Sequence, residues 1–140
     1  MSPLVARLIR VVAAACLAVS GYVHAYLYDN GYRVIPRIGV AFLLQASASI
    51  AVAVLLPFTG LVLLRLAAAG LAGGALVAFT MSRTIGVLGF EEHGLQPAPQ
   101  ALLSVVVEVS ALLALAVPVV LRMTPAQQRR PVPSAASTPR

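Results

Sequence analysis

Four long apolar stretches divide the chain, and shorter segments rich in polar residues, glycine and proline separate them. The stretches run over residues 9–28, 38–56, 61–81 and 101–121. A helix needs about 20 residues, each rising 1.5 Å, to cross a hydrocarbon core about 30 Å thick. The stretches lack the alternation of polar and apolar positions that is typical of a membrane barrel strand. The pattern therefore predicts an all-α, polytopic membrane protein with a four-transmembrane-helix bundle over residues 1–124.

The second and third stretches are separated only by Pro57, Phe58, Thr59 and Gly60, which predict a tight turn. A connection this short makes the two helices antiparallel neighbours. Within the third stretch, Gly70 and Gly74 form a G-x-x-x-G pair, which allows two helix backbones to approach closely. We expect this pair to pack against another helix of the same chain, with a homodimer contact as the alternative.

Composition agrees with a membrane environment, because 60% of the 140 residues are hydrophobic and only 10% are charged. About a quarter of the residues are charged in a typical soluble domain. The formal net charge is +6, but the ten basic residues are all arginine and lie scattered at helix ends, without a dense patch. This distribution argues against a nucleic-acid partner and makes the lipid bilayer the expected one.

The arginines also predict the orientation, because loops on the cytoplasmic side carry an excess of basic residues. Seven fall on the side of the two termini, namely Arg7, Arg10, Arg65, Arg122, Arg129, Arg130 and Arg140. Three fall on the opposite side, namely Arg33, Arg37 and Arg83. Both termini are therefore expected inside. Residues 125–140 are rich in proline, serine and arginine, and we expect a disordered cytoplasmic tail there.

An alternative for the first stretch is a cleavable signal peptide, since Arg7 and Arg10 precede an apolar run that leads to Val23-His24-Ala25. Cleavage after Ala25 would leave three helices. The apolar stretch continues to Tyr28 and is long enough to span a bilayer, which favours four helices.

Glu108 is the leading candidate for a functional residue, because it lies well inside the fourth stretch. An acidic residue at the centre of a membrane helix costs about 3 kcal/mol, so it must face the bundle interior, be paired or be protonated. Gln45 lies at a similar depth; Ser104 and Ser49 are one helical turn from Glu108 and Gln45 respectively. With His24, these residues predict a buried polar network. Such a network would have a functional role, as a protonatable gate or a cation ligand, or a structural role, in which it fixes the register of the helices.

Further polar residues are expected at the outer face, near this network. The candidate partners are Asp29, Arg33, Arg83, Glu91, Glu92 and His93. The four tyrosines, Tyr22, Tyr26, Tyr28 and Tyr32, are expected to form an interfacial belt. Of the two histidines only His24 lies on a membrane helix, so we predict neither a metal site nor a haem. The segment 83–100 is interpreted either as a lid over the polar cluster or as a loop packed on the helix ends.

The segments HAYLYDNGYRVIPRIGVAFLLQ, residues 24–45, and SRTIGVLGF, residues 82–90, together with Glu108, carry a resemblance. The chain resembles a group of uncharacterised small four-helix integral membrane proteins of GC-rich Gram-positive bacteria. The resemblance implies a multi-pass protein of the bacterial cytoplasmic membrane and suggests that the outer polar cluster matters. It implies no activity and no cofactor.

Three functions are consistent with these features. The first is a non-enzymatic accessory or scaffold subunit of a membrane complex, because the chain is small, has no room for a soluble domain and has glycine-lined helix faces. The second is a small ion- or proton-coupled transporter that uses Glu108. The third is a haem- or quinone-linked redox protein, which rests only on His24 and the tyrosines. The sequence contains no phosphate-binding loop, nucleophile elbow or zinc-protease motif.

Overall fold

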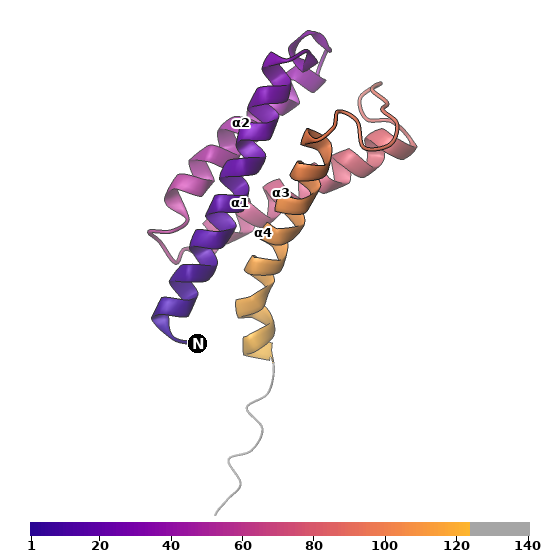
Figure 1. The fold of residues 1–140 in the computed structure, drawn as a ribbon. Coiled ribbons are helices and arrows are strands. Elements are labelled where there is room, and N and C mark those ends of the chain that lie inside the picture. The colour runs from indigo at the N-terminus through magenta and orange to yellow at the C-terminus, as the bar shows by residue number, and fades with distance from the viewer. Residues whose placement is uncertain (124–140) are drawn as a thin grey trace, which may run out of the picture.

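The computed structural model of the chain describes residues 1–123, so the tail expected at 125–140 lies outside the described residues. It contains four long helices, α1 (Pro3–Asp29), α2 (Ile38–Leu55), α3 (Val62–Thr84) and α4 (Gln100–Met123) (Figure 1). A short 3₁₀ helix, η1 (Tyr32–Val34), lies between α1 and α2. All four long helices are long and apolar enough to cross a membrane. The prediction of an all-α fold with four such helices is confirmed.

The first helix begins earlier than predicted, at Pro3 rather than at residue 9. Ser2 caps it, because its hydroxyl accepts a hydrogen bond from the backbone N–H of Val5 at 3.3 Å. Pro3 suits the first turn of a helix, where a backbone N–H has no partner inside the helix. The other helix ends differ from the predicted ones by a turn or less.

The main packing unit is the antiparallel pair α1 and α2, with α4 along a second face of α1. The helix α3 packs on α4 and α2 and barely touches α1. In Figure 1 the C-terminal end of α3 lies well away from α1 and α2. The predicted α2–α3 neighbours therefore do contact each other, but α1 is the larger partner of α2.

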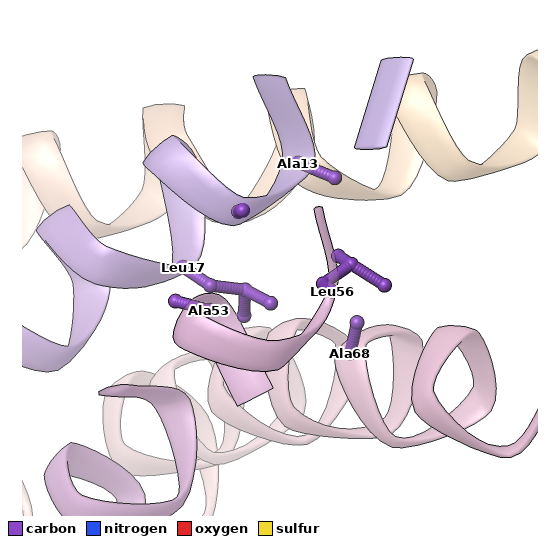
Figure 2. Close-up of a cluster of buried hydrophobic side chains, with 6 residues drawn as sticks. Ala13, Leu17, Ala53, Leu56 and Ala68 are labelled. Carbon is purple, nitrogen blue, oxygen red and sulfur yellow. The ribbon is translucent and has the colours of Figure 1, made fainter. Parts of the chain in front are cut away.

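The two ends of the bundle have different connections. We call the end with residues 57–61, where α1 begins and α4 ends, the turn end. The opposite end carries residues 30–37 and 85–99, and we call it the loop end. Near the turn end, small and branched side chains form a tight core (Figure 2). The helix α1 contributes Ala13 and Leu17 to it, α2 and the residue after it contribute Ala53 and Leu56, and α3 contributes Ala68. The alanines let the backbones approach closely.

A second hydrophobic cluster closes the loop end. It consists of Val23, Leu27, Tyr32 and Ile38, with Val87 and Phe90 packed against them. Because Val87 and Phe90 belong to the segment between α3 and α4, this segment packs on the helix ends. The structure thus shows a loop packed on the helix ends; since residues of the same segment also line the polar cavity described below, the interpretation of residues 83–100 as a lid over the polar cluster stays open.

The glycines of α3 do not pack as predicted. Among the described residues, a Cβ atom built at Gly70, Gly73 or Gly74 would meet no atom within 4 Å, so none of these glycines makes a close helix contact, and Gly74 lines the cavity described below. The expected packing of Gly70 and Gly74 within the chain is wrong, because α3 makes its contacts with other residues. Close approach occurs instead at Gly21 of α1, where a Cβ would lie 3.0 Å from the Ile50 side chain of α2.

Candidate functional site

A cavity of about 190 Å³ lies in the half of the bundle nearest the loop end. All four helices and the segment 85–99 contribute to its lining. Aromatic residues, among them Phe42 and Phe79, line it as well. Its polar and ionisable lining residues are His24, Tyr32, Gln45, Ser82, Arg83, Glu92, Ser104 and Glu108. The cavity forms where α3 diverges from α1 and α2, so the tilt of one helix creates the space.

Glu108 is the buried polar centre of this site. It is only 2% exposed, and Ser104 of the same helix donates a hydrogen bond to its Oε1 atom at 2.7 Å. Ser20 of α1 donates a second hydrogen bond to the same atom at 2.9 Å. Within residues 1–123, no hydrogen bond reaches the other carboxylate oxygen, Oε2. Glu108 thus has one oxygen held by two serines and one oxygen without a donor.

His24 extends the network by one helical turn of α1. Its Nδ1 atom lies 2.9 Å from the backbone oxygen of Ser20 and 3.5 Å from the Ser20 hydroxyl oxygen. A carbonyl oxygen only accepts, so this contact requires a proton on Nδ1. In the neutral ring, Nε2 is then the acceptor nitrogen. Ser20 therefore contacts both residues with different atoms: its backbone oxygen accepts from His24, and its hydroxyl donates to Glu108.

Two predicted members do not join this network. The amide of Gln45 donates to the backbone oxygen of Leu71 in α3 at 3.1 Å and not to Glu108, although both residues line the cavity. Ser49 is fully buried, and its hydroxyl has no hydrogen-bond partner among the described residues. Gln45 and Glu108 thus share the cavity, but neither Gln45 nor Ser49 is hydrogen-bonded to Glu108 among the described residues, because Ser49 lies on the buried side of α2.

A second polar group lies at the loop end of the cavity. The Tyr32 hydroxyl donates a hydrogen bond to Oε1 of Glu92. The other oxygen, Oε2, forms an ion pair with Nη1 of Arg83 at 2.8 Å. Burial, followed by the hydrogen bond and charge of Glu92, raises the pKa of Tyr32 above its ordinary range. Arg83 also donates to the backbone oxygen of Gly94 at 2.8 Å and lies over the Phe79 ring. This arginine thereby ties the segment 85–99 to the end of α3.

The other outer-face candidates do not take part in the site. Asp29, Arg33, Glu91 and His93 are exposed, and none of them lines the cavity. Among the residues that the structure describes, no three histidines, cysteines or carboxylates gather as a metal ligand set. Tyr22 and Tyr26 are exposed, as the predicted tyrosine belt requires, whereas Tyr32 is buried.

Tyr32 and Ser20 are the two functional candidates that sequence reasoning missed or misplaced. Tyr32 is buried because η1 folds it back over α2, where its ring stacks on Phe42 with centroids 4.6 Å apart. Ser20 lies one helical turn before His24 on the same face of α1, and this spacing was a usable signal. The spacing alone does not show that Ser20 lies opposite α4.

The arrangement can accept a proton or a small cation. A buried carboxylate with a free oxygen is an acceptor, and aromatic rings around it favour a positive charge. The imidazole of His24, one helical turn from Ser20, lines the same cavity and is a second group that can exchange a proton.

Comparison of the chain with protein-family models, with curated proteins and with solved structures finds no match. The resemblance described from the sequence stays an expectation, and the function has to be argued from the site.

Proposed function

We propose that this protein is a small cation- or proton-coupled membrane carrier, in which the cavity near the loop end binds the cation and Glu108 is its acceptor. One observation carries the proposal: Glu108 is buried among apolar helices, lines the cavity and keeps one carboxylate oxygen free of hydrogen bonds from residues 1–123. Intramembrane acids are rare because of their cost, and they commonly mark ion or proton pathways.

The arginine distribution supports an orientation for this carrier. With the termini inside, the loop end and the cavity lie near the outer face of the bacterial cytoplasmic membrane. The segment 85–99 then covers the cavity on its outer side, held by the Arg83–Glu92 ion pair. Opening of this segment would connect Glu108 to the outside, and movement of the loosely packed α3 would connect it to the inside.

The test is cation-dependent flux in proteoliposomes that contain a pH-sensitive dye and are exposed to gradients of Na⁺, K⁺ or methylammonium. The wild-type protein should change the internal pH in response to at least one of these cations, and Glu108→Gln should lower that rate at least about tenfold. Ser49→Ala is the matched control, because it removes a buried hydroxyl that has no partner in the described chain.

Two results would reject the proposal. One is a wild-type rate equal to that of empty liposomes for all three cations. The other is a flux that persists in Glu108→Gln. Folding of each variant is checked by its elution volume and helical circular dichroism, so that loss of flux is not mistaken for loss of the protein.

The second candidate is the accessory or scaffold subunit, and one observation favours it. A Cβ atom at Gly70 or Gly73 of α3 would meet no atom of the described residues within 4 Å, which leaves room for a close helix–helix contact with another protein. Purification in mild detergent distinguishes the two functions. A defined partner protein that is lost in Gly70→Leu supports a subunit, whereas a monomer or homo-oligomer alone counts against it.

A further inference from the structure

The turn end of the bundle brings together two arginines from different helices. A Cβ atom at Gly60 would lie 3.6 Å from Nη1 of Arg10 in α1 and 3.9 Å from Nη2 of Arg65 in α3. Both guanidinium groups therefore reach the same point of the α2–α3 turn. Both side chains are partly buried, unlike Arg7 earlier on α1, which is exposed.

Neither guanidinium has a counter-charge among residues 1–123. The acidic residues Asp29, Glu91 and Glu92 are at the loop end, and Glu108 is held by serines in the cavity. No hydrogen bond or ion pair reaches Arg10 or Arg65 from within residues 1–123, and Nε of Arg10 is buried without a partner. Two like charges beside a buried, unpaired donor destabilise this end unless an anion satisfies them.

The first turn of α3 adds further donors at the same place. Its N-cap residue, Leu61, makes no side-chain capping hydrogen bond, and the first turn contains no acidic residue. The leading backbone N–H groups of a helix have no partner inside the helix and lie at the positive end of its dipole. Since Arg65 belongs to this first turn, its charge and these N–H groups act on the same region.

We propose that Arg10, Arg65 and the N-terminus of α3 form a binding site for a phosphate group. Arginine forks and helix N-termini both match the geometry and charge of phosphate oxygens. The site lies where apolar helices end, which is the depth of lipid headgroups in a bilayer. The phosphate belongs either to an anionic phospholipid or to a free phosphate ion, and both have the required chemistry.

Binding of lipid to the full chain in detergent micelles tests the site by native mass spectrometry. The probes are phosphatidylglycerol and phosphatidylcholine with the same acyl chains. Wild-type protein should prefer phosphatidylglycerol, and Arg10→Gln and Arg65→Gln should each weaken that binding about fivefold. Arg7→Gln is the control, because it removes the same charge from an exposed position on α1 and should leave the binding unchanged.

A second arm identifies the source of the phosphate. Protein in phosphatidylcholine nanodiscs is heated with inorganic phosphate or with chloride at equal ionic strength. A phosphate-specific rise in melting temperature that is lost in Arg65→Gln, without a preference for phosphatidylglycerol, assigns the site to the free ion. The proposal is overturned if neither probe binds, or if Arg7→Gln reduces binding as much as the other two variants do. If Arg10→Gln fails to fold, Arg65→Gln alone decides the outcome.

Discussion

At the scale of single residues, the Ser20 hydroxyl is the polar link between α1 and α4. It donates to Glu108 at 2.9 Å, whereas Ser104 holds the same carboxylate from within α4. Both serines satisfy the buried charge, but only Ser20 does so across a helix interface. The two hydroxyls therefore differ in what they contribute to the stability of the bundle.

Ser20→Ala should lower the free energy of unfolding by about 1 kcal/mol, since hydrogen bonds between membrane helices are worth about 0.6 kcal/mol on average and up to about 1.7 kcal/mol. Ser49→Ala should leave it unchanged or slightly raised, because the Ser49 hydroxyl is buried without a partner in the described chain. Reversible unfolding by dodecyl sulfate in mixed micelles measures both. Equal losses in the two variants would contradict the assigned role of Ser20.

Tyr32 gives a pH dependence whose direction follows from its surroundings. Its pKa is raised first by burial and then by Glu92, so the folded state favours the neutral phenol. The stabilisation is fully present below the ordinary tyrosine pKa of about 10 and is lost as the pH rises from there toward the higher folded value.

The ultraviolet difference titration between wild type and Tyr32→Phe isolates this phenol. Its midpoint should lie above about pH 10, the ordinary tyrosine value. In a Glu92→Gln background the midpoint should fall, because the hydrogen bond to a carboxylate and its negative charge are both removed, while burial keeps part of the shift. A midpoint at or below pH 10 in the wild-type protein would show that Tyr32 is not buried against Glu92.

At the scale of elements, two glycines on neighbouring helices differ in the space around them. A Cβ at Gly39, near the start of α2, would lie 2.8 Å from the backbone oxygen and 2.9 Å from the Cα atom of Arg33. Backbone atoms cannot rotate away, so η1 would have to shift. A Cβ at Gly70 would meet open space.

Gly39→Ala should therefore lower the free energy of unfolding by about 1–3 kcal/mol, as overpacking does in a tight core. Gly70→Ala should not lower the free energy of unfolding, because alanine has a higher helix propensity than glycine and its Cβ atom meets no clash. Melting in detergent followed by circular dichroism compares the two. A loss in Gly70→Ala as large as in Gly39→Ala would mean that another helix covers the Gly70 face.

The helices could be predicted from the sequence because apolar length alone identifies them. The missed start of α1 has a local cause, since the Ser2 cap and Pro3 extend the helix beyond the apolar stretch. The tilt of α3 could not be predicted. A G-x-x-x-G pair permits close packing but does not require it, and a Cβ atom at Gly70 or Gly74 would meet no atom within 4 Å in the part of the chain that the structure describes.

The candidate site was predictable where spacing along one helix decides it. The Ser104–Glu108 contact follows from residues four apart on α4, and so does the neighbourhood of Ser20 and His24 on α1. Contacts between helices were not predictable, because they depend on helix rotation. Gln45 therefore meets the backbone of Leu71 instead of Glu108, and Ser49 meets no polar group among the described residues.

At the scale of the whole molecule, charge and cavity define opposite ends. The cavity, the Arg83–Glu92 ion pair and three of the four acidic residues belong to the loop end, whereas Arg10 and Arg65 meet at the turn end without a counter-ion within residues 1–123. Basic residues stay preferentially on the cytoplasmic side. We therefore expect the two proposed sites to face opposite sides of the membrane.

Labelling of single cysteines in intact cells tests this arrangement. In a Cys16→Ser background, His93→Cys at the loop end should react with a membrane-impermeant maleimide, and Phe58→Cys in the α2–α3 turn should react only after the cells are opened. Both positions are exposed, with Phe58 at 80%, so burial does not explain a difference between them. The reverse labelling pattern would place the cavity at the cytoplasmic face. The mass of the mature chain gives the matching control, because a start at Tyr26 would remove most of α1. Ser20 and His24 would be lost, and with Ser20 the hydrogen bond from α1 to Glu108.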